Sequence, residues 1–153
     1  MWSFEAYRTV APGEDCAQLF HKIARPKHDA EVIDFGAGTG KGALALALFG
    51  GLRVQMLDFA ANCLDEDVRN ATLSQPTRIK FAQHDLTRPI PFSAEYGYCT
   101  DVLEHIPPDW VATVLLNILK SAQHVFFQIA CTEDHCGKLI GHTLHLSVHD
   151  YQW

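Results

Sequence analysis

The segment from Glu31 to Gly42, EVIDFGAGTGKG, constrains the fold more than any other part of the chain. An apolar run ends in an acidic residue, three glycines follow at alternating positions, and an alanine–leucine stretch comes next. That order predicts a buried strand, a glycine turn and a helix, because glycine adopts positive φ and lets a ligand approach the main chain closely. In α/β folds such a turn lies at the carboxyl end of a strand, where these folds bind ligands.

The spacing of the glycines distinguishes between nucleotide-binding patterns. The dinucleotide pattern G-x-G-x-x-G needs a glycine where Lys41 stands, and the third glycine comes one residue early, at Gly40. The phosphate-binding pattern G-x-x-x-x-G-K-[ST] needs a glycine in place of Phe35 and a hydroxyl in place of Gly42. The pattern that remains is acidic-x-G-x-G-x-G, beginning at Asp34.

Strand and helix patterns alternate along the rest of the chain. Strands are expected at about 30–35, 53–58, 78–83, 95–100 and 124–130, and helices at 13–24, from the glycine turn to about 49, at 60–73 and from 107 to about 121, with a Pro-rich loop at 88–92. The run 124–130 is the most apolar, so we expect it to be a central or near-central strand. This alternation predicts an α/β fold with a doubly wound, mainly parallel sheet.

Acidic residues stand at the ends of three further expected strands. Asp58 ends the second, where a carboxylate can accept hydrogen bonds from both ribose hydroxyls of a cofactor. Asp85 follows the third, and Asp101 follows the fourth in the segment DVLEHIP, which ends at Pro107. An acid at a strand end is also a common helix N-cap, and for Asp85 both interpretations stay open.

With these features the chain resembles the class I S-adenosylmethionine-dependent methyltransferases over residues 30–130. The glycine turn looks like their motif I, and D-x-L-E-H-x-P looks like a segment of the small-molecule enzymes of the methyltransferase-11/12 type. The resemblance implies a Rossmann-like sheet, S-adenosyl-L-methionine as cofactor, and an enzyme that transfers a methyl group to a small-molecule acceptor by in-line displacement. It also implies that Asp85, with the next backbone N–H, recognises the adenine edge. The cofactor-binding residues that follow from it are Asp34, Gly36, Ala37, Gly38, Gly40, Asp58, Phe59, Asp85, Leu86 and Asp101.

His105 is the candidate catalytic residue. It lies just beyond the fourth strand, beside the expected methyl position, and an imidazole titrates near neutrality, so it suits a base for a hydroxyl or phenol acceptor. The alternative is that His105 and Glu104 cap the next helix and position Asp101. Asp34 is expected to support the glycine loop by accepting backbone N–H bonds. Lys41 is expected to be solvated, with steering of the cofactor carboxylate as the alternative.

The C-terminal part of the chain is rich in histidine and cysteine. Cys131 to Cys136 and His145 to His149 come near the spacings of zinc ligands. If 144–149 is a strand, however, its histidines and Ser147 share one polar outer face opposite the apolar residues. We therefore assign no metal ligand, with a metal site and a substrate-facing wall as alternatives.

Composition and length limit the remaining possibilities. A chain of 153 residues predicts a single domain, 1–153, with an N-terminal helical cap (1–29), a cofactor-binding core (30–130) and a partial C-terminal segment (131–153). The net charge of −6 without a basic block makes a nucleic-acid partner unexpected. The absence of a long apolar run or a secretory pattern, with an odd number of cysteines, predicts a cytoplasmic protein with reduced thiols and no membrane partner. A methyltransferase sheet usually has more strands than this chain offers, so we expect a C-terminally truncated chain. The sequence does not indicate an oligomeric state.

Two other functions stay open. One is an S-adenosylmethionine-binding protein or fragment without transfer activity. The other is an NAD-dependent oxidoreductase, which Lys41 in the third glycine position disfavours. The acceptor class is narrowed by absences, because no [DNS]-P-P-[YF] segment follows the fourth strand and no Pro-Cys pair occurs.

Overall fold

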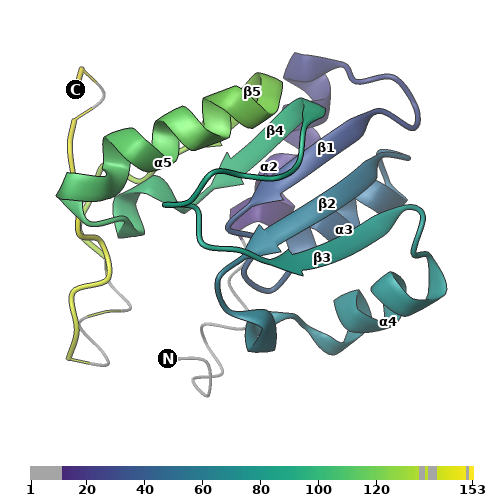
Figure 1. Cartoon of the computed structure of the whole chain (residues 1–153), viewed down its shortest axis with the longest axis horizontal. Helices are drawn as coiled ribbons and strands as arrows, with labels where there is room; N and C mark the ends of the chain where they lie inside the picture. The colour runs from purple at the N-terminus through teal and green to yellow at the C-terminus, as the bar shows by residue number, and fades with distance from the viewer. Residues whose placement is uncertain (1–11, 135–136, 138–140, 151) are drawn as a thin grey trace.

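The protein has one parallel sheet with helices on both faces (Figure 1). The computed structural model describes residues 12–134, 137, 141–150 and 152–153. The sheet order is β3-β2-β1-β4-β5. This confirms the predicted doubly wound α/β fold. The strands are β1 (Glu31–Phe35), β2 (Arg53–Asp58), β3 (Ile79–Gln83), β4 (Ala94–Thr100) and β5 (Ala122–Gln128). The helices are α2 (Pro12–Ala24), α3 (Lys41–Leu48), α4 (Glu66–Ser74) and α5 (Pro108–Ser121), with short 3-10 helices η1 (Ala61–Cys63) and η2 (Leu103–His105).

The strand order reverses at β1, which lies between β2 and β4. At its carboxyl end Phe35 pairs with Leu57 of β2 on one side and with Cys99 of β4 on the other. From β1 the chain winds outwards to β2 and β3, and then returns to form β4 and β5. A crevice outside the carboxyl ends of the strands at such a reversal is where open α/β sheets bind ligands.

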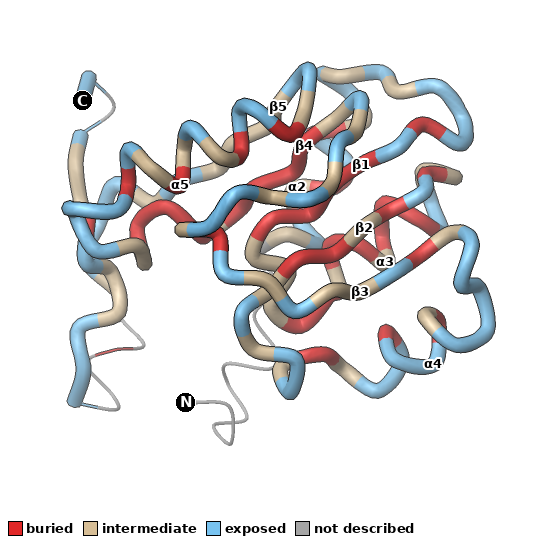
Figure 2. Tube along the Cα trace, viewed as in Figure 1, coloured by how far each residue is buried: buried red, intermediate tan, exposed pale blue. Residues whose placement is uncertain are grey.

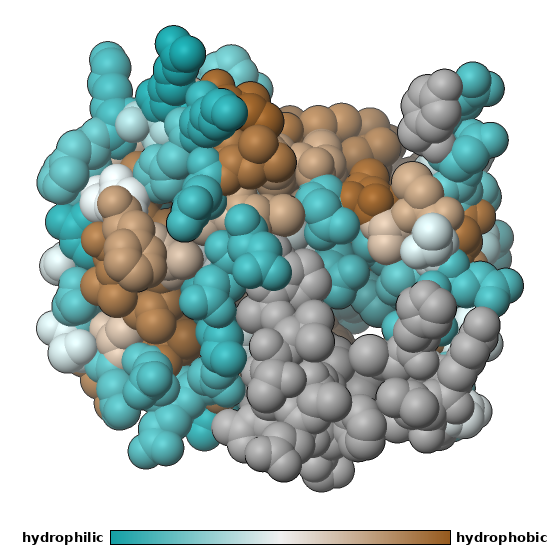
Figure 3. Space-filling view, turned by 180° about the vertical axis from the view of Figure 1, so that it is seen from behind, coloured by the Kyte–Doolittle hydropathy of each residue, from teal (hydrophilic) through white to brown (hydrophobic). Residues whose placement is uncertain are grey.

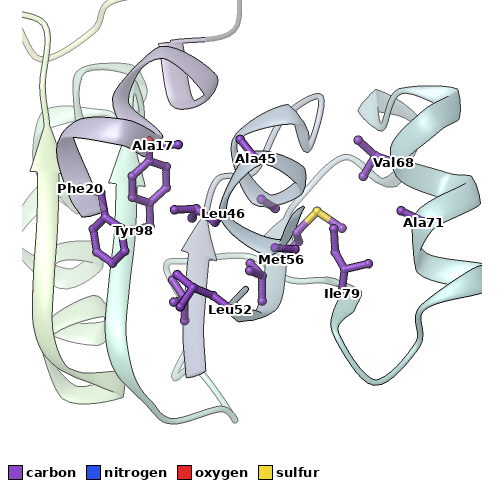
Figure 4. Packing of buried hydrophobic residues seen from close by; sticks show 14 of the residues in the cluster. Ala17, Phe20, Ala45, Leu46, Leu52, Met56, Val68, Ala71, Ile79 and Tyr98 are labelled. Atoms are coloured by element: carbon purple, nitrogen blue, oxygen red, sulfur yellow. The ribbon is translucent and has the colours of Figure 1, made fainter. Parts of the chain in front are cut away.

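Each face of the sheet carries its own apolar core, because successive side chains of a strand point to opposite faces. Val32 belongs to the cluster shared with α2, α3 and α4, which Figure 4 shows from close by. Ile33, the next residue, belongs to the cluster that α5 covers. Buried positions accordingly run along β1 and β4 in Figure 2. Apolar residues of the Pro-rich loop, Ile90 and Phe92, extend the cover of the second face.

Aromatic packing holds α2 against the first face. Phe20 makes edge contacts with Tyr96, Tyr98 and Phe126 at centroid distances of 5.5 to 5.9 Å. The Tyr98 hydroxyl donates to the main-chain carbonyl of Gly13. The predicted helix at 13–24 is therefore confirmed, and it packs against β4 and β5.

Two of the predicted elements differ in the structure. The helix expected at 60–73 begins only at Glu66, because the Asp58 carboxylate accepts the N–H of Ala60 at 2.8 Å and stabilises a turn there. The prediction that 124–130 is central or near-central was wrong, since β5 pairs only with β4 among the described residues. Its apolar residues instead pack on two different faces: Phe126 stacks on Tyr98 at 5.5 Å, and Phe127 joins the cluster under α5.

From the sequence, 144–149 could be a strand with a polar outer face, and the structure has no strand there. Residues 141–150 have no regular secondary structure, and in Figure 1 this part of the chain descends beside the start of α5. Ser147 is 6% exposed, whereas Leu146 is 44% exposed. Ser147 therefore faces the protein, where its N–H and hydroxyl donate to the main-chain carbonyls of Glu104 and Ile106.

Some apolar side chains remain on the surface, as brown areas among the teal in Figure 3. The most exposed on the described helices and their ends are Phe49, at 89%, and Leu73, at 80%. No helix in the described part of the chain has both the length and the apolar character to cross a membrane. Cys16, Cys63, Cys99 and Cys131 are free thiols, and Cys136 lies outside the described residues.

Candidate functional site

The three glycines after β1 have left-handed φ angles, but their surroundings differ. A Cβ on Gly36 (φ 69°) would lie 2.5 Å from a methyl carbon of Val102, and one on Gly40 (φ 77°) 2.6 Å from a methyl carbon of Val68. A Cβ on Gly38 (φ 53°) would meet nothing nearer than a main-chain oxygen at 4.0 Å. Two of the glycines therefore permit close packing inside the protein, and the middle one borders open space.

Main-chain N–H groups of the glycine loop have partners within the protein. Gly36 and Ala37 both donate to the carbonyl of Leu57, at 2.8 and 3.0 Å. Gly38 donates to the Asp58 carboxylate at 2.8 Å, and Gly40 to the carbonyl of Ala37 at 2.8 Å. A loop that cradles a phosphate aims its N–H groups at the ligand instead. This loop is therefore suited to a ligand that passes close to the backbone, not to one held by a row of N–H donors.

Asp58 lies half-buried at the carboxyl end of β2 and joins the strand to the loop. One carboxylate oxygen accepts the N–H of Gly38 and the other that of Ala60, each at 2.8 Å. Since a carboxylate offers about four acceptor sites, about two remain for a ligand. The next side chain, Phe59, is 75% exposed, and its carbonyl accepts a hydrogen bond from Gln83 at 2.8 Å. The end of β2 thus offers an acceptor for hydroxyls beside an exposed aromatic ring.

Asp34 is buried beneath the glycine loop, with 3% of its surface exposed. Burial, and secondarily the nearby Asp58 charge, raises the pKa of its carboxyl to about 7, while a hydrogen bond from the N–H of Ala43 opposes the rise. Its bond to Ala43, in the first turn of α3, connects β1 to the helix that follows the loop. Its hydrogen-bond partner therefore lies in α3, beyond the glycine loop in which the bonds were expected from the sequence.

Asp85 follows β3 at the same edge of the sheet. Its Oδ1 accepts both the N–H (2.9 Å) and the hydroxyl (2.7 Å) of Thr87, and these two bonds are the main causes that lower the pKa of this carboxyl. The N–H of His84 donates to the Asp58 carbonyl at 2.8 Å, which brings the two acidic segments together. Leu86 is buried against the second core. Asp85 therefore stabilises its own turn and also stands beside the end of β2.

Asp101 and His105 face each other just beyond β4. Asp101 has a φ of 58°, rare for a residue with a side chain, and its N–H donates to the Gln128 carbonyl at 3.1 Å. The Nε2 of His105 lies 3.7 Å from Oδ2 of Asp101, and its Nδ1 lies 3.0 Å from the carbonyl oxygen of Leu144. Because a carbonyl only accepts, Nδ1 carries the proton, and the Nε2 lone pair of the neutral ring is directed toward Asp101.

The electrostatics of this pair favour its charged forms. Burial lowers the pKa of His105, but the Asp101 carboxylate and the Leu144 carbonyl outweigh it, so the pKa is raised overall. The protonated His105 ring beside it, with Nε2 3.7 Å from Oδ2, in turn lowers the pKa of Asp101, although burial opposes this. Both side chains remain about one-third exposed, 35% for His105 and 37% for Asp101, so they are accessible to a substrate.

Glu104, considered from the sequence only as a helix cap beside His105, is a structural residue of the site. Its side chain is fully buried, and one carboxylate oxygen accepts the N–H of Ala130 just after β5. Its carbonyl accepts the N–H groups of Leu146 (2.7 Å) and Ser147 (3.0 Å), and the Ser147 hydroxyl donates to the Ile106 carbonyl at 2.6 Å. These bonds fix the C-terminal segment against η2.

Two further placements complete the site. The C-terminal segment brings His145 against His105, with ring centroids 4.8 Å apart. Lys41, expected to be solvated, is 30% exposed and pairs with Asp65 at 3.3 Å. No local sequence signal pairs His145 with His105, because their contact is made between segments far apart in the chain.

Comparisons with known proteins support a single family. A family model described as a methyltransferase domain matches residues 32–123. Among solved structures, magnesium protoporphyrin IX methyltransferase from Synechocystis PCC 6803 with bound SAH has a TM-score of 0.59 and 20% identity, over 72% of this chain and 50% of that one. Haemonchus contortus phosphoethanolamine N-methyltransferase 2 in complex with S-adenosyl-L-methionine has a TM-score of 0.72 and 18% identity, over 95% and 36%.

A third similar structure is coclaurine N-methyltransferase bound to N-methylheliamine and SAH, with a TM-score of 0.60 and 15% identity over 75% of this chain and 35% of that one. At such identities the likeness shows the fold alone. The chain spans about half or less of the length of these three proteins. No curated protein sequence matches the chain significantly.

Proposed function

The chain belongs to the family of S-adenosylmethionine-dependent methyltransferases, and on this basis we propose that it binds the cofactor over the glycine loop and transfers a methyl group to a small-molecule acceptor. Three of the similar structures carry names of methyltransferases for small compounds, namely magnesium protoporphyrin IX, phosphoethanolamine and coclaurine. This supports a small-molecule acceptor for the present chain.

The residues at the carboxyl ends of β1 and β2 fit this cofactor. Gly38 leaves open space beside the loop, where a side chain would obstruct a ligand. Asp58 retains acceptor sites for ribose hydroxyls, and the exposed ring of Phe59 offers an apolar surface to a purine. Asp85 and Leu86 would contact the adenine edge, while Asp34, Gly36, Ala37 and Gly40 would shape the loop from inside. Asp101 would border the methyl group.

His105 would act as the base in the transfer. The bound cofactor supplies a methyl group on a positively charged sulfur, so the protein needs no covalent catalysis. In an in-line displacement the acceptor gains the methyl group and loses a proton, and the Nε2 of His105 would accept that proton. Asp101, 3.7 Å away, stabilises the imidazolium that forms, and the Leu144 carbonyl holds the ring in the required tautomer.

The environment of Gly38 is the observation that carries the cofactor proposal. We expect calorimetric titration to show binding of S-adenosylhomocysteine and no binding of NAD. Gly38→Ala should weaken the binding of S-adenosylhomocysteine at least about tenfold, because the alanine side chain would occupy the space beside the loop. Gly141→Ala is the matched control: it also has positive φ (74°) and open surroundings, so it shares the backbone strain but not the location.

The outcomes separate the alternatives. Binding of NAD in place of S-adenosylhomocysteine would overturn the cofactor assignment. Equal affinity in the Gly38→Ala variant and wild type would overturn the placement over the loop. Tight binding of S-adenosylhomocysteine without turnover on any acceptor in a panel of hydroxyl, phenol and amine compounds would favour a cofactor-binding protein without transfer activity.

A further inference from the structure

A group of three potential metal ligands lies beyond the carboxyl end of β4. Asp101, His105 and His145 each offer one ligand atom, and these atoms all lie within 4.8 Å of one another. They come from three separate places: the end of β4, the helix η2, and the C-terminal segment that packs against η2. All three side chains are partly buried, so an ion between them would be shielded without being sealed from solvent.

The two histidines make the same kind of hydrogen bond. Nδ1 of His105 lies 3.0 Å from the carbonyl oxygen of Leu144, and Nδ1 of His145 lies 2.7 Å from that of Thr132. Since a carbonyl cannot donate, each Nδ1 carries a proton, which makes Nε2 the atom of the neutral ring that can bind a metal ion. A metal-ligating histidine almost always donates its other ring N–H to a carbonyl, carboxylate or water in this manner.

The main chain holds the three side chains in place. Asp101 adopts an uncommon positive φ of 58°, stabilised by its N–H bond to the Gln128 carbonyl. His145 is flanked by residues that bind η2, since the N–H groups of Leu146 and Ser147 both donate to the Glu104 carbonyl. The His105 and His145 rings are in edge contact, with their centroids 4.8 Å apart, so the two histidines are already adjacent without an ion.

We propose that Asp101, His105 and His145 bind one divalent transition-metal ion of the zinc class. Two imidazoles and one carboxylate are the donor set that such ions take, and three protein ligands leave a coordination position open. With metal–ligand bonds of about 2.0–2.1 Å, tetrahedral ligands stand about 3.3 Å apart. The His105–Asp101 separation of 3.7 Å is close to this value, and since all three ligand atoms lie within 4.8 Å of one another, no separation needs to shorten by more than about 1.5 Å.

Metal binding and proton transfer would use the same lone pair. An ion on Nε2 of His105 prevents that atom from accepting a proton, so the metal-loaded chain should lose the His105-dependent part of any methyl transfer. This consequence rests on the proposed function. The metal site itself does not, because it is tested by binding in the absence of cofactor and acceptor.

The test is calorimetric titration of the metal-free, full chain with ZnCl₂, repeated with CoCl₂ to observe the d–d absorption of a bound ion. We expect one ion per chain and, for His145→Ala, binding weakened at least about 100-fold. The matched control is His149→Ala, from the same segment, because the His149 ring stacks on Trp153 at 4.0 Å and does not belong to the cluster. This control should bind zinc as the wild type does.

A second ligand variant, a folding control and a cysteine variant complete the test. Asp101→Asn, which preserves side-chain size, should also weaken binding, and circular dichroism should show each variant folded. Equal zinc affinity in wild type, His145→Ala and Asp101→Asn would overturn the site. So would binding lost in Cys131→Ser and kept in His145→Ala, because the ion would then lie elsewhere in the C-terminal part.

Discussion

The buried Asp34 carboxyl predicts an unusual dependence of stability on pH. Its pKa is raised from 3.8 to about 7, chiefly by burial and then by the Asp58 charge. Between these pH values the folded protein keeps a proton that the unfolded chain has lost. The free energy of unfolding should therefore fall as pH rises, by about 1.4 kcal/mol per pH unit from about pH 4 to about pH 7.

The total effect follows from the same two values. The difference between 3.8 and about 7 corresponds to about 4 kcal/mol of stability that is present below pH 4 and lost above pH 7. This is a large part of the 5–15 kcal/mol that typical domains have. Asp34→Asn stays neutral at every pH and has nearly the same volume, so it should lack this contribution.

The measurement is urea denaturation of wild type and Asp34→Asn from pH 4 to pH 8, followed by circular dichroism. The quantity of interest is the variant's free energy of unfolding minus that of the wild type, because other titrating groups largely cancel. It should rise by about 4 kcal/mol across the range. When proteins with and without Asp34→Asn are compared again in a background that also carries Asp58→Asn, the difference should rise less with pH. The reason is that the Asp58 charge is the second cause of the raised Asp34 pKa. A difference that does not vary with pH would refute the reasoning.

Three further predictions concern the site. His105→Ala should abolish turnover and leave S-adenosylhomocysteine affinity intact; unchanged turnover would remove His105 from the mechanism. The wild-type kcat/KM should rise with pH through a pKa above 6.5, and Asp101→Asn should move this limb to lower pH, because the carboxylate raises the pKa of His105. Gly36→Ala should lower the free energy of unfolding by about 2–4 kcal/mol in urea denaturation, since its Cβ meets Val102 at 2.5 Å and φ is 69°; a loss no larger than that of Gly141→Ala would contradict the steric argument.

Local patterns in the sequence predicted most of the secondary structure. The order of apolar strand, alternating glycines and helix was correct because backbone preferences act over neighbouring residues. The same reasoning failed for the helix at 60–73, where the Asp58 side chain bonds to the Ala60 N–H and delays the helix. It also failed for β5, because the apolar character of 124–130 reports two covered faces and not the number of neighbouring strands.

Part of the candidate site could likewise be predicted from the sequence, and part could not. The strand-end positions of Asp58, Asp85 and Asp101 could be placed from sequence, since the carboxyl ends of parallel strands meet at one edge of the sheet. Their actual hydrogen bonds could not, because these depend on loops such as the one that places Gly38 against Asp58. The separate roles of the three glycines also depend on neighbours distant in the chain, such as Val102 and Val68.

The sequence by itself determined the fold class, the glycine turn and the strand-end acids, because each depends on residues close together along the chain. Only the tertiary structure decided that Ser147 turns inward and that His145 meets His105 and Asp101. The physical reason is that Glu104 binds the C-terminal segment through its main-chain carbonyl. Every residue carries such a carbonyl, so no pattern of side chains in the sequence indicates the contact that brings these three residues together.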